Sequence, residues 1–381
     1  MLKKGILTFC LLLLTLQFGS AQTVASSDSI KYAFLPALAF NSDLGFIFGG
    51  IGNRYDYRDG AKPFYSYTNI SGIFSTRGLA SFEVSMDKPK VFETNIRLTS
   101  NIYASKFLQD SYFGLRNYQK INSIPENLPQ FYEFQSFSLG FNGTLRFPLF
   151  VDSKLNQLDV LAILNFDYET PIDNGSERLI SFEKPLGFEG GRTFMIGSGL
   201  IWEARNSEFN PTKGVYTETS VELGNKVWGS SFNTLVLKHD MRHYLTFTII
   251  KDITFANRFY LKHTSGTVPY WKLSYAGDAE TLRGYPAKRF LDDNVFILNN
   301  ELRTWLFDFP SVSTKLGGTI FADVGRTFSN DTPFDAITSG LKYTYGFGAT
   351  TSVFTPDFII SADIGFSDED TGVYINIGYM F

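Results

Sequence analysis

Apolar and polar side chains alternate along most of this chain with a period of two residues. In residues 371–381 the odd positions, such as Val373 and Ile375, are large and apolar, whereas the even positions are mostly small or polar. Residues 296–306 and 316–324 repeat the pattern. Successive side chains of a β-strand point to opposite faces, so this period predicts strands that each have one apolar face.

The same reading predicts about 16 strands. They cover residues 31–40, 44–55, 64–76, 79–87, 91–104, 133–147, 157–170, 192–205, 213–224, 233–246, 253–266, 295–306, 313–325, 340–350, 357–366 and 371–381. An even number of alternating strands predicts a single-domain, all-β fold, an antiparallel transmembrane β-barrel. The links from odd-numbered to even-numbered strands include every long one, near 105–132, 171–191 and 267–294. The other links are short, as at 87–90 and 351–356, and this asymmetry is typical of the external and periplasmic ends of such barrels.

A soluble β-sandwich would also contain alternating strands. A sandwich of this length would need a second domain, yet neither a linker nor a change in composition interrupts the chain. The last predicted strand ends on Phe381 and leaves no tail, which also favours the barrel.

The first residues have the layout of a cleavable secretory signal. Two lysines precede an apolar stretch over residues 6–18, and small residues follow at 19–21. The stretch is short for a membrane span, which needs about 20 apolar residues. We therefore expect a signal peptide over 1–21, a short segment over 22–30 and the barrel over 31–381, with no room for a periplasmic domain ahead of it.

Composition narrows the class of protein further. The only cysteine, Cys10, lies in the predicted signal, so the mature chain would hold neither a disulfide nor a thiolate metal site. Aromatic residues make up 17% of the chain, yet its mean hydropathy is −0.06, as expected when apolar and polar positions alternate. The net charge of −4 argues against nucleic acid as a partner.

No catalytic, cofactor or metal site is expected. His239 and His243 share the more apolar face of a predicted strand, so they are interpreted as wall residues rather than as a metal pair. No serine has the histidine and acid companions of a hydrolase triad, and no phosphate loop or dinucleotide fingerprint occurs.

The strongest functional signal is an arginine motif in the last long loop, formed by Arg283, Gly284 and Tyr285. The next two predicted strands place Glu301 and Asp323 on the lumenal face. A guanidinium inside a water-poor lumen needs charged, bidentate partners, which two carboxylates supply. Gly284 would let the loop tip turn without a side-chain clash. We predict that the loop folds into the barrel.

With these residues the sequence resembles the BamA/TamA family, the bacterial surface antigen barrels of outer-membrane assembly and translocation machines. In that family an Arg-Gly-aromatic motif follows the eleventh strand, and its arginine contacts acidic residues on the twelfth and thirteenth. The matching residues are Arg283, Gly284 and Tyr285, with Glu301 and Asp323 as the acidic partners.

Further segments carry the same resemblance, which covers about residues 31–381. Residues 205–214 resemble the family's turn between strands eight and nine, and residues 112–115 resemble its aromatic-glycine segment in the third external loop. Two departures stand out. Family members usually carry periplasmic domains before the barrel, which puts client recruitment by that route in doubt here. Gly277 and Asp278 stand where many members have paired glycines.

The first and last predicted strands meet at the closing seam of the barrel. Pro36 lies inside the first strand and removes a backbone donor, which is tolerated mainly at strand edges. A poorly paired seam can open sideways and expose backbone groups that a client strand would complete. Pro36 is equally well explained as a proline near the wet end of a strand. Gly378 and Phe381 would form the other lip and the protein's own insertion signal.

The resemblance implies an insertase or translocase in the outer membrane of a Gram-negative-type bacterium, which assists the assembly or transport of outer-membrane proteins or lipids and is not an enzyme. The expected partners are outer-membrane lipids, client outer-membrane proteins, and accessory periplasmic or outer-membrane subunits. The alternative is a passive pore or a structural subunit of a larger outer-membrane complex.

Overall fold

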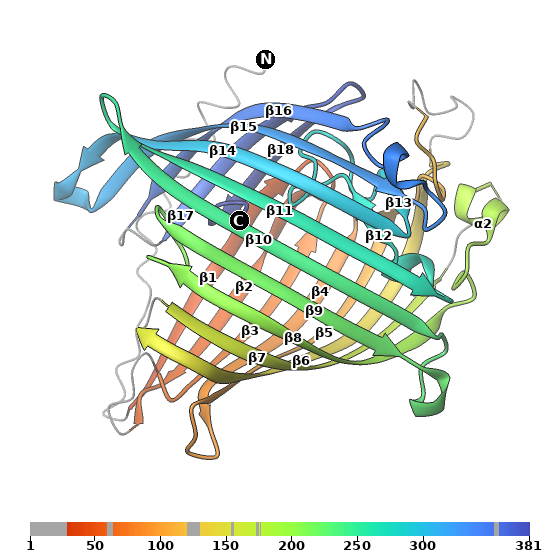
Figure 1. The fold of residues 1–381 in the computed structure, drawn as a ribbon, viewed down its shortest axis with the longest axis horizontal. Coiled ribbons are helices and arrows are strands. Elements are labelled where there is room, and N and C mark those ends of the chain that lie inside the picture. The colour runs from red at the N-terminus through yellow and green to blue at the C-terminus, as the bar shows by residue number, and fades with distance from the viewer. Residues whose placement is uncertain are drawn as a thin grey trace.

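A computed structural model describes residues 29–58, 64–119, 130–153, 156–172, 175, 177–353 and 358–381 of the chain. In this part, sixteen antiparallel strands close into one barrel (Figure 1). The predicted fold class is therefore confirmed, and the β-sandwich alternative is wrong. The predicted signal peptide lies outside the described residues.

Every predicted strand overlaps a strand of the barrel wall. The wall strands are β1 (Ile30–Asn41), β2 (Gly45–Asp56), β3 (Ser66–Ser75), β4 (Leu79–Val91), β5 (Ile96–Ser111), β6 (Glu133–Ser153), β7 (Asn156–Pro171), β8 (Gly191–Arg205), β9 (Gly214–Gly224), β10 (Thr234–Thr248), β11 (Asp252–Gly266), β14 (Asn294–Phe309), β15 (Thr314–Phe328), β16 (Lys342–Ser352), β17 (Ile359–Phe366) and β18 (Thr371–Ile377). Each pairs with its neighbours in chain order, except that β11 pairs with β14 across a loop and β1 pairs with β18 to close the barrel.

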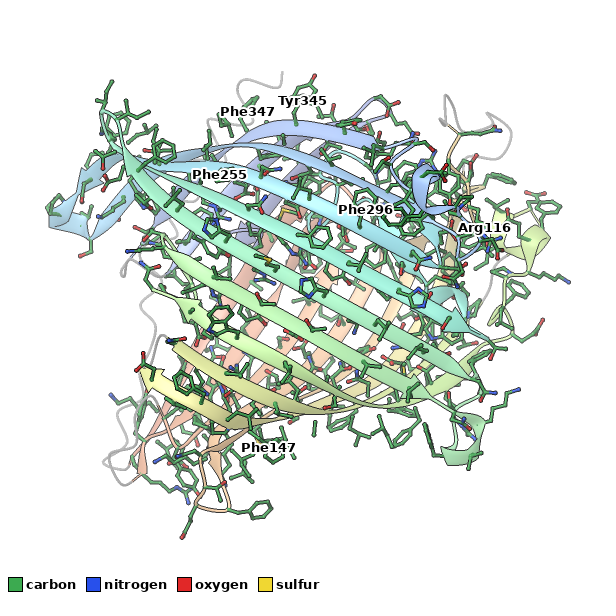
Figure 2. The ribbon with its side chains drawn as sticks, in the orientation of Figure 1. Arg116, Phe147, Phe255, Phe296, Tyr345 and Phe347 are labelled. Carbon is green, nitrogen blue, oxygen red and sulfur yellow. The ribbon has the colours of Figure 1, made fainter. Side chains whose placement is uncertain are left out.

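Side chains alternate between the two faces of the wall. Tyr345 and Phe347 project from the outer surface of β16 (Figure 2), whereas Thr344 on the other face is buried. Apolar side chains thus face outward and mainly polar ones face the lumen, as a barrel in lipid requires. Within the described ranges, no helix is long and apolar enough to cross a membrane.

The links between strands differ at the two ends of the barrel. The longest ones, from β5 to β6, from β7 to β8 and from β11 to β14, lie at one end, which we call the long-loop end. It also carries α2 (Leu179–Glu183), η3 (Lys226–Trp228), η4 (Tyr270–Lys272) and η6 (Phe334–Ala336). The opposite, short-turn end has tight connections such as 249–251 and η5 (Pro310–Val312).

Several predicted boundaries are wrong. β5 and β6 extend to Ser111 and Ser153 rather than to residues 104 and 147. The turn expected at 87–90 lies at 92–95, because β4 continues to Val91 through an irregular register that accommodates Pro89. The last strand ends at Ile377 rather than at residue 381, since Gly378 adopts a φ of +94° and turns the chain out of the wall.

Candidate functional site

The loop between β11 and β14 folds back into the barrel. Its two arms form a small hairpin, in which β12 (Ser274–Ala276) pairs with β13 (Phe290–Asp292). Apolar side chains of the hairpin and its tip are buried against β14. This cluster comprises Ala276, Leu282, Tyr285, Phe290, Val295 and Ile297. The buried apolar contacts fix the hairpin inside the lumen and leave its tip, residues 277–289, to carry the polar groups.

Arg283 lies at this tip and is 1% exposed. Its Nε and Nη2 atoms donate to the two carboxylate oxygens of Asp323 on β15, both at 2.9 Å. Its Nη1 donates to Oε1 of Glu301 on β14 at 2.5 Å. The guanidinium carbon also lies 3.4 Å from the centroid of the Phe321 ring. The buried guanidinium is therefore neutralised by a bidentate pair with Asp323 and a single hydrogen bond to Glu301, and it stacks on the face of the Phe321 ring.

A second layer of polar groups surrounds this pair. Asn299 donates to Asp323 at 3.0 Å and to the carbonyl of Thr281 at 2.7 Å, which ties the loop to the wall again. Asp363 on β17 lies 3.5 Å from Nη1 of Arg283. Nε of Arg303 donates to Oε2 of Glu301 at 2.7 Å. Glu301 thus holds two guanidinium groups at once.

Residues after Arg283 bind both lips of the seam at the long-loop end. The Gly284 N–H donates to the Tyr374 hydroxyl on β18 at 2.9 Å, and the Tyr285 hydroxyl donates to Asp368 in the turn between β17 and β18. On the other lip, the Ala287 N–H donates to Asp43, between β1 and β2, at 2.7 Å. The loop therefore bridges β18 and β1.

The same loop crosses the lumen to the opposite wall. Lys288 donates to Asp110 on β5 at 3.0 Å, and Lys272 pairs with Asp167 on β7. Arg289, which is fully buried, donates to Glu369 at 2.6 Å. These contacts of Lys288, Lys272 and Arg289 fasten the loop on several sides of the barrel.

Burial raises the pKa of the Asp278 carboxyl at the loop tip to about 7.

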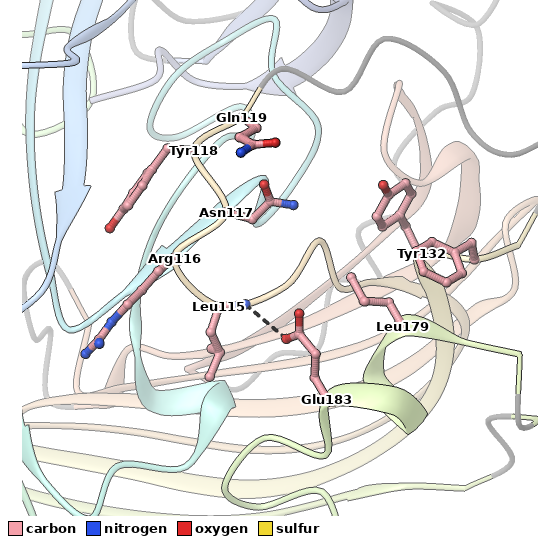
Figure 3. A pocket seen from close by; sticks show the side chains of 9 residues that line it. Leu115, Arg116, Asn117, Tyr118, Gln119, Tyr132, Leu179 and Glu183 are labelled. Atoms are coloured by element: carbon pink, nitrogen blue, oxygen red, sulfur yellow. Dashed lines mark hydrogen bonds between the residues drawn. The ribbon is translucent and has the colours of Figure 1, made fainter.

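Segments at the long-loop end cap the inward-folded loop. A cavity of about 550 Å³ lies beside α2 (Figure 3). Residues 112–115, singled out in the sequence, contribute Leu115 to its lining. The Tyr112 hydroxyl donates to Glu183, which also lines the cavity, at 2.7 Å, and the Leu115 N–H donates to the same carboxylate at 3.3 Å. Arg116 pairs with Asp292 at 3.3 Å. The cap is therefore joined directly to the inward-folded loop.

The closing seam is short. In the described residues, β1 and β18 share one ladder pair, between Asn41 and Tyr374. The Ser42 N–H donates to the carbonyl of Val373 at 3.0 Å, and the Val373 N–H donates to the Ser42 hydroxyl at 2.7 Å. Pro36 pairs with Gly50 of β2 and has no ladder partner on the β18 side. Most of β1 therefore presents one unpaired edge.

The four residues after β18 enter the lumen, and we call them the inward segment (residues 378–381). Phe381 is 7% exposed and packs with Tyr244 and Ala256 on β10 and β11. Nη2 of Arg303 donates to the main-chain oxygen of Phe381 at 3.0 Å. The segment is thus held on the inner face of the wall, away from β1.

The structure brings together Arg283, Glu301 and Asp323. Pro36 lies on β1 at one lip of the seam, whereas Gly378 begins the inward segment and bonds to β17 rather than to β1. Phe381 does not lie in the wall. Sequence reasoning missed Tyr374, Asp363 and the partnership of Glu301 with Arg303. The alternation places these residues on the lumenal face of their strands, but their contacts depend on how deeply the loop enters the barrel. In the described part of the chain, no group of three histidine, cysteine or acidic side chains could hold a metal ion.

Comparisons with known proteins bear on this arrangement. The family model described as Omp85 superfamily domain matches residues 67–381. The chain is similar to BamA from Haemophilus ducreyi lacking POTRA domains 1–3, with 14% identity and a TM-score of 0.63 over 93% of this chain and 70% of that one. It is also similar to CdiB from Acinetobacter baumannii (13% identity, TM-score 0.57) and from Escherichia coli (13%, 0.59). In both cases 93% of this chain is covered, but only 61% and 64% of the CdiB chains, which is less than two thirds of their length. No curated protein sequence matches.

Proposed function

Because the chain belongs to the Omp85 superfamily, we propose that it is an insertase or translocase of the outer membrane of a Gram-negative-type bacterium. In this proposal it assists client outer-membrane proteins, or lipids, into or across that membrane and carries out no enzymatic reaction. Accessory periplasmic or outer-membrane subunits would deliver the clients.

The observation that carries the proposal is the seam. One ladder pair joins β1 to β18 in the described residues, so the β18-facing edge of β1 presents unpaired backbone groups. Unpaired edges are templates for another strand, and in lipid each unsatisfied group costs several kcal/mol. A client strand that adds to this edge would satisfy those groups and enter the membrane beside the barrel.

The inward-folded loop would keep the long-loop end of this seam in register. It contacts Asp43 on one lip and Tyr374 on the other, and Arg283 fastens it to the wall. The lips can then part toward the short-turn end without the barrel falling open. In the proposed function, the Arg-Gly-Tyr motif therefore holds one end of the seam closed while the other end opens.

Depletion of the protein in its own bacterium tests the proposal. We expect the levels of other outer-membrane proteins, or the lipid asymmetry of the membrane, to fall, and the parent gene to restore them. Arg283→Ala should not restore them, whereas its matched control Arg97→Ala, which removes a partly exposed arginine paired with Asp87, should. Unchanged protein levels and lipid asymmetry after depletion would contradict the proposal.

A further inference from the structure

Three hydrogen-bonding side chains lie side by side on the outer surface of the barrel wall, and we call them the polar row. His243 on β10 is the ladder partner of Asn257 on β11, and Asn257 is in turn the ladder partner of Asn300 on β14. Ladder partners project from the same face of a sheet. Leu245, two residues from His243 along β10, is 50% exposed, so this face is the outer one.

The polar row lies inside the apolar band of the wall. Met241 and Leu245 flank His243 on the outer face of β10, and both are exposed. Phe255 on β11 lies toward the short-turn end of this wall and Phe296 on β14 toward the long-loop end, with the row between them (Figure 2). The row therefore faces the hydrocarbon of a bilayer, in which lipid tails offer no hydrogen bonds.

The chain itself satisfies the polar row only in part. Nδ2 of Asn257 donates to Oδ1 of Asn300 at 2.8 Å. Among the residues that the structure describes, nothing donates to Oδ1 of Asn257, and the ring of His243 makes no hydrogen bond. His239, four residues along the same strand, differs because its ring is paired with the Thr219 hydroxyl at 2.8 Å. Polar groups left without a partner in lipid are costly, so the row calls for a partner from outside the chain.

A second copy of this chain supplies the matching groups. Oδ1 of Asn257 is an acceptor, and the imidazole of His243 beside it carries at least one N–H donor in either protonation state. A two-fold axis along the membrane normal, placed between these two residues, would set the imidazole of each copy against the amide oxygen of the other. Such a contact satisfies both copies at once.

Packing through the polar row would leave the seam free. In the closed barrel, the four strands β14, β15, β16 and β17 separate β11 from β18. Each barrel of a pair would therefore keep its own β1 edge exposed to lipid.

We propose that the polar row is an intramembrane interface through which two copies of this chain form a dimer in the bilayer. The hydrogen bonds of His243 and Asn257 hold the two walls together, and the surrounding apolar side chains pack around them. The proposal goes beyond the proposed function and does not depend on it, because the dimer is a property of the purified chain.

Energy transfer between labelled copies measures the association. V227C, at a 91% exposed site between β9 and β10, carries a donor or an acceptor dye in a background without Cys10, and both batches are mixed in lipid vesicles at falling protein-to-lipid ratios. We expect a dimer that dissociates on dilution. N257L should raise its dissociation constant about ten-fold, because the change removes two hydrogen bonds from the dimer. The matched control is S100L, two residues from the exposed Ile102 on the outer face of β5, and it should leave the dissociation constant unchanged.

Cross-linking locates the interface. M241C on β10 and I70C on β3 are both outward and exposed, but β3 lies on the far side of the barrel. A short, membrane-permeant bifunctional thiol reagent should join two copies of M241C and not two copies of I70C, and H243L should lower the yield from M241C. Heat-dependent gel mobility verifies that each variant is a folded barrel.

Three results would overturn the proposal. A chain that stays monomeric at every protein-to-lipid ratio would exclude the dimer and point to a different membrane protein as the partner of the polar row. Equal dissociation constants for N257L and S100L, or cross-linking from I70C and not from M241C, would place the contact between copies elsewhere on the wall. None of these results depends on whether the protein inserts clients.

Discussion

Gly284 and Gly365 lie backbone against backbone where the tip of the inward-folded loop meets β17. A Cβ atom on Gly365 would lie 2.7 Å from the carbonyl carbon of Arg283, and one on Gly284 would lie 2.9 Å from the carbonyl carbon of Gly365. Gly284 also has a φ of +105°. The absence of both side chains lets Arg283 reach Asp323, so the depth of the loop is set by this pair of glycines.

Gly365→Ala should therefore lift the loop tip from the wall. Overpacking of this kind costs about 1–3 kcal/mol, and the loss should appear as a lower melting temperature and faster proteolysis of the loop. Gly72→Ala on β3 is the matched control, because a Cβ atom there meets nothing within 4 Å. Identical behaviour of the two variants would show that close glycine contact is not what positions the loop.

Removal of the loop arginine should destabilise the barrel strongly. Arg283→Ala leaves Glu301 and Asp323 buried, with Asp323 stripped of its bidentate partner, and breaking a buried pair costs about 3–5 kcal/mol. The expected readouts are lower abundance in the membrane and loss of heat resistance on an unheated gel. Arg283→Lys should rescue only partly. If the Arg283→Ala variant melts like the parent, this arginine does not stabilise the barrel.

Stability of the loop should depend on pH through Asp278. Burial raises the pKa of its carboxyl from the ordinary 3.8 to about 7, so the folded state binds the proton more tightly than the unfolded state does. The free energy of unfolding therefore falls as pH rises between these values. Asp278→Asn keeps an oxygen for the Glu280 N–H and the Thr281 hydroxyl but cannot ionise.

Melting curves at pH 5 and pH 8 check this. Between pH 5 and pH 8 the melting temperature of the parent should fall more than that of Asp278→Asn. At pH 8 the variant should melt a few degrees above the parent. Asp335→Asn, at an exposed carboxylate in η6, is the control and should follow the parent. Parallel pH profiles for parent and Asp278→Asn would be inconsistent with this account.

Conductance distinguishes the proposed function from a passive pore. The loop reaches Asp110 and Asp167 on the far wall, so it obstructs the lumen. Planar bilayers should show small, erratic currents for the parent and larger ones for Arg283→Ala. Large, steady currents from the parent protein would favour the open-pore alternative.

Alternation alone placed every wall strand, because a barrel in lipid must repeat the same two-sided environment along each strand. It also set the lumenal parity of Glu301, Asp323 and Arg303, which is why their chemistry could be anticipated. The pattern did not reveal the inward segment. Side chains alternate through Gly378 in the same way whether the chain stays in the wall or bends into the lumen.

The contacts of the inward-folded loop also could not be predicted from the sequence. Gly365 and Tyr374 meet Gly284 only because the hairpin of β12 and β13 descends to a particular depth, and no local pattern on β17 or β18 encodes that depth. Three-residue strands such as β12 are too short for a periodicity test. Sequence therefore located the motif, and tertiary packing determined its partners.

The most direct measurement of the central claim uses the purified barrel in lipid vesicles. A small outer-membrane barrel protein, unfolded in urea, is diluted into these vesicles and its folding is followed by gel mobility. We predict that the parent accelerates this folding over empty vesicles. The register of Asn41 with Tyr374, continued along β1, places Leu35 opposite Met380, so the variant L35C/M380C can form a disulfide across the seam. This disulfide should abolish the acceleration until it is reduced. Equal folding rates with and without the barrel, or an acceleration that the closed seam leaves intact, would contradict the account.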